Sequence, residues 1–532
     1  MGVPGFFREL CKKSQGLLLK APSENVDNLY FDYNCLLHPQ FFETLKLNQD
    51  ENDPDTLFDL IFENIIKKTM LIIEHCKPRK MIYIAVDGVA PEAKIKQQRE
   101  RRMGSNDYKN VITKKHNIKQ NTTYENIVFT PGTEFMYKLH KRLKETFLTY
   151  PGVDIIYSSY LVPSEGEHKI LDHIRTKCSP KTVSVIYSND ADLVFLALTR
   201  HNRRIFVLRD EEKSLLYVDN VSVSNNVNKI MSGGSCSDFI TLCALLGNDF
   251  VPKIPSTDTF FKGLDKLLQA YRETKQHSTS LFNKKINFSF LEKILVELGN
   301  QEQEYFSVEL PKLIQQKRKR HNHSLRGYDR DIWLVETLRA EVVDGKLCHM
   351  KIHDNVKLGV GKPREWKRRY YQHYFGDVDV DDICKHYLEG LSWMTEYYFV
   401  SCPSWTWKYK YTHAPFASDL GNYLHKMKKC LDITFVESKP WDVFTQLAAV
   451  IPRRHKDLLP KQLREISAPS SPLYQFYPSE FSIDKINNVA LYRCVPNIPV
   501  IDMKQVDAFV KKAKLTKQER KRCKPGSVYH FF

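Results

Sequence analysis

The sequence has no paired cysteines. Its twelve cysteines are scattered singly over 532 residues, and no C-x-x-C pair occurs. Structural zinc sites usually contain paired cysteines, and disulfide frameworks occur in short secreted chains that are dense in cysteine. The sequence therefore argues against a structural zinc site and against a disulfide framework. The pattern is typical of a protein in a reducing compartment.

Long apolar runs are also absent. No stretch approaches the roughly 18 residues that a membrane-spanning helix needs. The first residues, MGVPGFFREL, lack the apolar segment of a signal peptide. We therefore expect no membrane association. With 42% hydrophobic residues, the chain can bury a sizeable core, as one large domain or as two to three smaller ones.

Acidic residues are fewer than basic ones. The 63 Asp and Glu against 80 Lys and Arg leave a formal net charge of +17. Such an excess favours polyanionic partners, because Lys and Arg displace counterions from phosphates. A basic protein with no nucleic-acid role is the alternative, since net charge carries no information about fold.

Three short apolar runs end in polar or acidic residues. NLYF at 28–31 leads into Asp32, MIYIAV at 81–86 into Asp87, and VSVIY at 183–187 into Ser188, Asn189 and Asp190. Each run predicts a buried strand, and helical stretches at 55–74 and 133–150 lie between them. Alternation of strands and helices predicts an α/β fold with a largely parallel sheet.

Ligand sites of such sheets lie beyond the carboxyl ends of the strands, so these acidic residues are expected to share one pocket. The candidate set is Asp32, Asp87, Glu165, Glu167, Asp190, Asp192 and Asp249. Carboxylates this numerous need cations to ionise together. Hard oxygen ligands suit Mg²⁺ or Mn²⁺, and two such ions could promote phosphodiester hydrolysis.

Two of these sites have a structural alternative. Ser164 and Glu167 fit the S-x-x-E capping box of a helix at 168–176, and Asp190 could cap a helix at 193–198. Considered one at a time, capping is the better explanation. Considered with the other carboxylates, metal binding is favoured, and both roles can coexist.

A basic stretch, GVAPEAKIKQQRERR, follows Asp87. Lys94, Gln98, Arg101 and Arg102 are spaced i, i+4, i+7 and i+8, which places them on one face of a helix. Such donors are suited to gripping a phosphate beside the metals. A solvated basic helix is the alternative.

Aromatic residues suggest contacts with single-stranded nucleic acid. His38 follows Asp32 by six residues, and CPSWTWKYKYTHAPFASDL interleaves aromatic residues, Trp405 and Trp407 among them, with lysines. Aromatic and imidazole rings stack on unpaired bases. Ordinary core packing explains such residues equally well.

Several long blocks follow one another in a fixed order. In the first half they read NLYFDYNCLLH, IAVDGVAPEAKIKQQRERR, FTPGTEFM, VPSEGEHKI, YSNDADLVFLAL and LLGNDFVPKIPS. In the second half they read EGLSWMTEYYF, CPSWTWKYKYTHAPFASDL, QLAAVIPRRHKDLLP and FYPSEFSID. With the start MGVPGFFREL, these blocks resemble the Xrn family of 5′→3′ exoribonucleases over residues 1–510.

The resemblance implies a PIN or 5′-nuclease-like α/β core at 1–265 and a second α+β region at 328–510 packed on the core. The basic stretch LIQQKRKRHNHSLR predicts a variable basic linker at 266–327, and the basic composition of residues 511–532 predicts a mobile tail. The resemblance also implies a processive enzyme of mRNA decay that converts RNA with a 5′-monophosphate to nucleoside 5′-monophosphates, with two Mg²⁺ ions, or Mn²⁺ in their place. The seven acidic residues would bind the metals and catalyse. Lys94, Gln98, Arg101 and Arg102 would hold the 5′-phosphate. His38 and either Trp405 or Trp407 would stack on bases.

The expected partners are single-stranded RNA and, as candidates, decapping factors. We expect a short, monomeric member of the family in the cytoplasm, with the nucleus left open by the basic tail. Two departures from the family pattern are Cys35, where Gly is usual, and Thr412 with His413, where the usual YHYAP reads YTHAP. Neither touches the acidic set.

Two other functions compete with this one. A flap-type DNA nuclease would share the acidic pocket, but FVPKIPSTDTF and GLDKLL after Asp249 lack its Gly-rich helix-hairpin-helix. A non-enzymatic RNA-binding protein would have lost acidic residues, and all seven are present.

Overall fold

A computed structural model describes residues 17–51, 53–104, 107–118, 125–211, 214–257, 262–275, 279–319, 322, 324–339, 354–427 and 431–531. The start MGVPGFFREL lies outside these residues. Among the described residues, no helix combines the length and the hydropathy needed to cross a membrane.

The core is an eight-stranded sheet with the order β1-β7-β6-β5-β2-β3-β4-β12. Its strands are β1 (Leu18–Leu19), β2 (Asn28–Asp32), β3 (Met81–Ala85), β4 (Asp154–Ser158), β5 (Ser184–Tyr187), β6 (Ile205–Glu211), β7 (Ser214–Asp219) and β12 (Tyr529–Phe531). The five central strands, β6 to β4 in this order, are parallel, and the outer pairings are antiparallel. The predicted α/β fold and its three strands are therefore confirmed.

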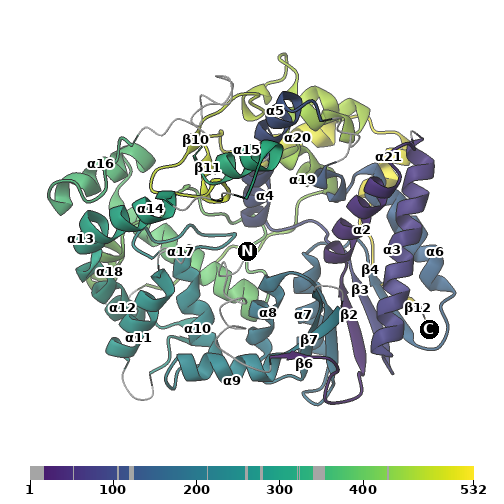
Figure 1. The fold of residues 1–532 in the computed structure, drawn as a ribbon, viewed down its shortest axis with the longest axis horizontal. Coiled ribbons are helices and arrows are strands. Elements are labelled where there is room, and N and C mark those ends of the chain that lie inside the picture. Colours follow the sequence, from purple (N-terminus) through teal and green to yellow (C-terminus); the bar gives the residue numbers. More distant parts are fainter. Residues whose placement is uncertain are drawn as a thin grey trace.

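Helices cover both faces of the sheet (Figure 1). One face packs against α2 (Tyr33–Leu47), α3 (Pro54–Cys76) and α6 (Glu134–Leu148), and the other against α7 (Gly166–Lys177), α8 (Ala191–Ala197), α9 (Asn220–Ile230) and α10 (Cys236–Cys243). Alternate residues of β2 supply the two cores: Leu29 and Phe31 face the first layer and Tyr30 the second. The expected helices at 55–74 and 133–150 correspond to α3 and α6.

The second half of the chain is largely helical. Its helices are α11 (Gly263–Thr274), α12 (Phe288–Asn300), α13 (Glu302–Glu304), α14 (Leu310–Lys319), α15 (Gly327–Glu336), α16 (Pro363–Phe375), α17 (Val380–Phe399), α18 (Ala417–Met427), α19 (Val443–Val450), α20 (Met503–Lys512) and α21 (Lys517–Cys523). Short strands pair as β8 (Phe282–Asn283) with β9 (Lys285–Ile286) and β10 (Ile483–Asp484) with β11 (Val495–Pro496). Apolar side chains of α12, α17 and α18 continue the second sheet core, so this half packs directly on the half that carries the sheet.

Helix α4 (Glu92–Gly104) lies between the sheet and the C-terminal helices, with α5 (Asp107–Lys115) after it (Figure 1). Its buried residues Ile95 and Met103 share a hydrophobic cluster with α19 and α20. The helix predicted for the basic stretch after Asp87 thus forms. One side of it packs on α19 and α20, and its two other sides face different parts of the molecule.

Two segments differ from expectation. The predicted linker at 266–327 contains α11 and α12, whose Leu267, Phe290 and Leu295 are buried in the main core. Their helical apolar periodicity outweighs the basic stretch that follows them.

The predicted mobile tail is built into the fold. β12 pairs antiparallel with β4, Tyr529 opposite Tyr157 and Phe531 opposite Ile155. The buried guanidinium of Arg522 donates from Nε and Nη2 to the carbonyl of Gly132, at 2.9 and 2.6 Å. A basic composition indicated a solvated tail, but the apolar face of α20 and the edge of the sheet hold it in place.

Candidate active site

Two carboxylates stand side by side at the carboxyl edge of the sheet. Asp32 is the last residue of β2 and is paired in register with Ala85 of β3, and Asp87 follows two residues later. Ser188, just beyond β5, donates to Asp32 Oδ2 at 2.9 Å. Three neighbouring strands therefore meet at this point, as the parallel topology requires.

The N-terminus of α7 closes on these two residues. The N–H of Gly166 donates to Asp87 Oδ1 at 2.6 Å. A Cβ at position 166 would lie 3.2 Å from Asp87 Oδ1, 3.4 Å from Asp32 Oδ1 and 3.0 Å from the carbonyl of Ala85. A side chain at this position would crowd the carboxylates, so glycine suits the close approach of the helix start.

Lys94 joins two further members of the set. Its Nζ lies 2.5 Å from Glu165 Oε1 and 2.7 Å from Asp249 Oδ2, and all three side chains are largely buried. Burial raises the pKa of each carboxyl, but Lys94 outweighs it and lowers the pKa of Glu165 and of Asp249. In return, these carboxylates hold the pKa of Lys94 well above its usual value despite burial. In this arrangement an ammonium supplies the positive charge between the two carboxylates.

For three other buried carboxyls, burial and like-charge repulsion outweigh the nearby cations and hydrogen-bond donors. Burial, with repulsion from Asp87, raises the pKa of Asp32 to about 7. Burial and the neighbouring Glu165 raise the pKa of Glu167 well above its usual range. Burial also raises the pKa of Asp87, where the N–H of Gly166 works in the opposite direction. These groups favour added positive charge, because neutralisation by a proton or by a cation relieves the same repulsion.

Asp190 and Asp192 complete the set at the start of α8. Asp190 is the N-cap, and its Oδ1 accepts the N–H of Asp192 at 2.9 Å, so the capping role does hold here. The other capping alternative does not, because α7 has Glu165 as its N-cap and no side-chain cap bond. Like-charge repulsion links Glu167 with Asp190 and Asp32, so the structure brings all seven predicted carboxylates into one cluster.

Three residues of this cluster were missed in the sequence. The ring of His168 lies 3.8 Å from that of Tyr397, and Tyr397 donates to Glu165 Oε2 at 3.1 Å. His168 also has a ring nitrogen within 4.8 Å of carboxylate oxygens of Glu165 and Glu167. Lys169 donates from Nζ to the carbonyls of Val86 and Ser159, at 2.7 and 3.0 Å, and burial lowers its pKa to about 7.

His168 and Lys169 directly follow Glu167, so their adjacency was an available signal. Tyr397 lies 232 residues from Glu165, and only the folded chain could reveal this contact.

The basic face of α4 divides into two parts. Lys94 points into the carboxylate cluster, whereas Arg101 and Arg102 lie at the far end of the helix, near His38. Burial, together with Arg101, lowers the pKa of Arg102 to about 9. Within the part of the chain that the structure describes, Nη1 of Arg102 is buried without a hydrogen-bond partner. Between the two parts, Gln98 Oε1 accepts from Gln446 Nε2 at 3.4 Å.

The two candidate tryptophans occupy different environments. Trp407 is half-buried and packs against the main core, stacking on Trp393 with ring centroids 5.5 Å apart and meeting Phe435 edge-on. Trp405 belongs to none of the hydrophobic clusters of the described residues, and its carbonyl accepts the N–H of Glu92 at the start of α4. Trp405 is therefore half-buried beside the helix that follows Asp87.

The donor set fits a hard divalent cation. Every candidate ligand among the seven offers a carboxylate oxygen, the donor type that Mg²⁺ and Mn²⁺ prefer. The raised pKa values of Asp32, Asp87 and Glu167 mark the positions with uncompensated negative charge. Glu165 and Asp249 need Lys94 to turn away before they can contribute fully.

Comparisons with known proteins agree with this architecture. Residues 1–211 match the family model described as XRN 5′-3′ exonuclease N-terminus, and residues 234–342 and 334–532 match that of the Xrn1 helical domain. Human 5′-3′ exoribonuclease 1 is 29% identical over 98% of this chain and 35% of its own length. The Saccharomyces cerevisiae protein of that name is 27% identical over 100% of this chain and 45% of its own length. Candida albicans 5′-3′ exoribonuclease 2 is 26% identical over 98% of this chain and 73% of its own length.

This chain thus spans a third to a half of the length of the first two of these relatives. Among solved structures, the catalytic core of Rad2 in complex with DNA substrate aligns over 66% of this chain and 84% of its own, with 12% identity and a TM-score of 0.30. A match with this score gives no support to an assignment of fold or function.

Proposed function

Because the chain belongs to the XRN 5′-3′ exonuclease family, we propose that it is a processive 5′→3′ exoribonuclease acting on RNA with a 5′-monophosphate. The observation that carries the proposal is the cluster of seven carboxylates at the strand ends, with Lys94 buried among them. The products would be nucleoside 5′-monophosphates, and the setting would be mRNA decay in the cytoplasm.

The carboxylate cluster would hold the metal ions. When bound, two Mg²⁺ ions, or Mn²⁺, would activate a water and stabilise the leaving oxygen of the phosphodiester. Asp32, Asp87, Glu167, Asp190 and Asp192 would be their main ligands, with Glu165 and Asp249 released from Lys94. The displaced ammonium of Lys94 would then be free to bind a phosphate oxygen of the RNA.

The far end of α4 would select the RNA end. Arg101, Arg102 and Gln98 offer charged and neutral donors to a terminal phosphate, and the buried Nη1 of Arg102 supports this role. These donors would favour a 5′-monophosphate over a 5′-hydroxyl by charge, and close packing around the phosphate would exclude a cap or triphosphate by size.

Stacking would hold the first bases. The His38 ring sits against Phe129 at the basic end of α4. Of the two tryptophans, Trp405 is the better candidate, because Trp407 already packs on Trp393 in the core. Each stacked base contributes about 1–3 kcal/mol to binding of a single strand.

The test uses 3′-labelled RNA with a 5′-monophosphate, 5′-hydroxyl or 5′-triphosphate, incubated with the purified chain and Mg²⁺. We expect mononucleotide release from the 5′-monophosphate RNA only. Arg101→Ala should reduce the preference for that end roughly 10- to 100-fold, since a charged hydrogen bond contributes about 1.5–3 kcal/mol. Arg142→Ala, an exposed arginine of α6, is the matched control.

Other outcomes would reject the proposal. Cleavage of a branched DNA flap without activity on RNA would favour a structure-specific DNA nuclease. RNA binding without any cleavage would favour a binding protein. An unchanged end preference in Arg101→Ala would reject the assignment of the phosphate pocket alone.

A further inference from the structure

A second cavity lies on the opposite side of α4 from the carboxylate cluster. It has a volume of about 300 Å³ and adjoins the cluster at Asp249. Lys96, Gln97 and Glu100 of α4 form one wall, and the segments 246–255, 411–413 and 486–495, with α16, form the others. A cavity of this size, with apolar walls and a few polar groups, is typical of small-molecule sites.

Three amide atoms of the lining residues have no hydrogen-bond partner among the described residues. Asn248 Oδ1 accepts the N–H groups of Phe250 and Val251, at 2.8 and 3.0 Å, which leaves its Nδ2 as a donor. Asn488 Nδ2 donates to the carbonyl of Ile486 at 3.3 Å, which leaves its Oδ1 as an acceptor. These two atoms and Gln97 Oε1 are buried with no hydrogen-bond partner among the described residues.

Such atoms point to a missing ligand. Each buried unsatisfied polar group costs about 1–3 kcal/mol, and native structures contain few of them without a reason. One donor and two acceptors on the walls of one cavity suit a polar ligand that both donates and accepts hydrogen bonds.

An aromatic wall faces these amides. The rings of Tyr374 and His413 stack with centroids 3.6 Å apart. The pair is held by Asp484, to which Tyr374 donates at 2.8 Å and which lies 3.1 Å from Nε2 of His413. Thr412 and His413, one of the two departures from the usual family sequence, both line this cavity. The other departure, Cys35, was expected not to touch the acidic set, but its Sγ donates to Asp32 Oδ2 at 2.9 Å in the carboxylate cluster.

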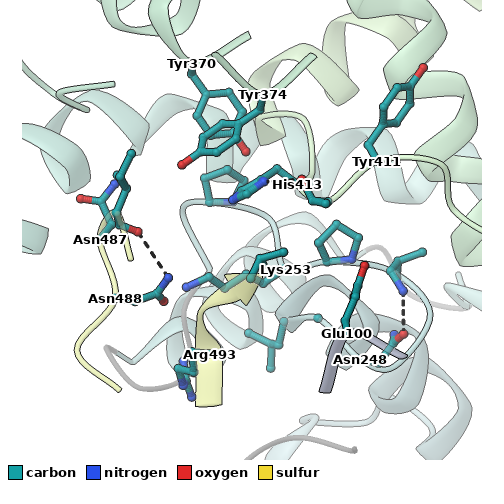
Figure 2. Close-up of a pocket in the computed structure, with 18 of the residues that line it drawn as sticks. Glu100, Asn248, Lys253, Tyr370, Tyr374, Tyr411, His413, Asn487, Asn488 and Arg493 are labelled. Atoms are coloured by element: carbon teal, nitrogen blue, oxygen red, sulfur yellow. Dashed lines mark hydrogen bonds between the residues drawn. The ribbon is translucent and has the colours of Figure 1, made fainter. Parts of the chain in front are cut away.

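Positive charge lies across from the rings. Figure 2 shows Tyr374 and His413 above the cavity and Asn488 and Arg493 below it, with Lys253 between. Aromatic faces, amide groups and cations in one cavity of this size suit a planar polar ring that carries an anionic group.

We propose that this cavity is a second nucleotide site, which binds a nucleoside 5′-monophosphate outside the carboxylate cluster. The choice of the 5′-monophosphate among nucleotides rests on the proposed function, because that activity would release it. The base would meet the aromatic wall, the amides of Asn248 and Asn488 would bind polar groups of the nucleotide, and Arg493 with Lys253 would meet the phosphate.

Isothermal titration calorimetry of the full chain in EDTA tests this, with adenosine 5′-monophosphate and uridine 5′-monophosphate as probes. EDTA keeps metal out of the carboxylate cluster, which then repels a phosphate. We expect saturable 1:1 binding with a Kd below about 1 mM. Asn488→Leu and Arg493→Ala should each weaken it about tenfold or more, since a hydrogen bond to a charged group contributes about 1.5–3 kcal/mol.

Matched controls separate the two sites. Arg368→Ala, an exposed arginine of α16 that does not line the cavity, and Asp192→Asn, in the carboxylate cluster, should leave the affinity unchanged. Loss of binding in Asp192→Asn with retention in Asn488→Leu would put the nucleotide in the carboxylate cluster and overturn the proposal. Absence of saturable binding would overturn it too.

Two further measurements test the phosphate assignment and the location of the site. Adenosine binding as tightly as its 5′-monophosphate would overturn the phosphate assignment. If the cavity variants fail to fold, photolabelling of the unmodified chain with an azido nucleotide decides: label near Tyr374 or His413 supports the site, and label only elsewhere rejects it. Nucleotide binding without exonuclease activity would support this site and reject the proposed function. Exonuclease activity without nucleotide binding would support the proposed function and reject this site.

Discussion

Lys94 and Lys96 lie two residues apart on α4, and their surroundings shift their pKa values in opposite directions. Burial lowers the pKa of both ammonium groups. For Lys94, Asp249 and Glu165 outweigh burial and raise the pKa well above its usual value. For Lys96 burial prevails, because Glu100 is 3.7 Å away and the other partner is the carbonyl of Tyr411, at 2.7 Å.

The difference shows that α4 separates two chemical environments. One side faces an excess of buried negative charge that requires cations. The other side faces a cavity with aromatic walls, amides and a balance of charges. Helical spacing predicts which residues share a side, but the elements packed against each side decide what those residues do.

The largest expected effect concerns the acidic side. Asp192→Asn should lower kcat on 5′-monophosphate RNA by about 10³-fold or more, because metal binding supplies several kcal/mol of charge stabilisation. Asp172→Asn, on the exposed surface of α7, is the matched control and should change kcat by less than about fivefold, as expected for a surface ion pair. Equal rates of Asp192→Asn and the unmodified chain would contradict the metal assignment.

The two lysines themselves provide the second test. Without metal at pH 7, Lys94→Met should lower the free energy of unfolding by about 3–5 kcal/mol, because Glu165 and Asp249 lose their buried partner. Lys96→Met should cost about 1 kcal/mol, the value of one hydrogen bond. Added Mg²⁺ should reduce the first loss and not the second. Chemical denaturation with and without Mg²⁺ measures both, and equal losses would remove the contrast between the two sides.

The tryptophans test the same contrast between site and core. Trp405→Ala should weaken binding of single-stranded RNA by about 1–3 kcal/mol and leave the stability nearly unchanged. Trp407→Ala should instead lower the free energy of unfolding by about 3–5 kcal/mol, through lost packing on Trp393. Fluorescence anisotropy with labelled RNA and thermal unfolding distinguish the two. Interchanged results would make Trp407 the stacking residue.

The last test is a dependence of stability on pH in the metal-free protein. The pKa of Asp32 is raised from 3.8 to about 7, so between these values the folded chain holds a proton that the unfolded chain has released. This contribution makes the folded state less stable as pH rises from about 4 to 7. Asp32→Asn lacks this contribution, so its stability advantage over the unmodified chain should widen with pH. Added Mg²⁺ should remove this dependence on pH. A difference in stability between Asp32→Asn and the unmodified chain that stays constant with pH would contradict the raised pKa of Asp32.

Local pattern was sufficient for the strands and helices that carry the site. The apolar runs before Asp32, Asp87 and Asp190 correspond to β2, β3 and β5, and the parallel order then brings their ends together. The basic stretch after Asp87 forms α4 as its spacing predicts. Weaker patterns were missed: the apolar face of α12 was taken for part of a linker, and the short strand β12 was assigned to a mobile tail.

The sequence by itself determined the α/β core, the strand ends that carry Asp32, Asp87 and Asp190, and the helix that carries the basic face, because each depends on periodicity or on the end of a strand. Only the tertiary structure decided that Lys94 meets Glu165 and Asp249, that Trp407 packs against the core while Trp405 does not, and that a cavity lies behind α4. These features depend on contacts between residues that are distant along the chain. Packing brings such residues together, and no local spacing encodes which of them will meet.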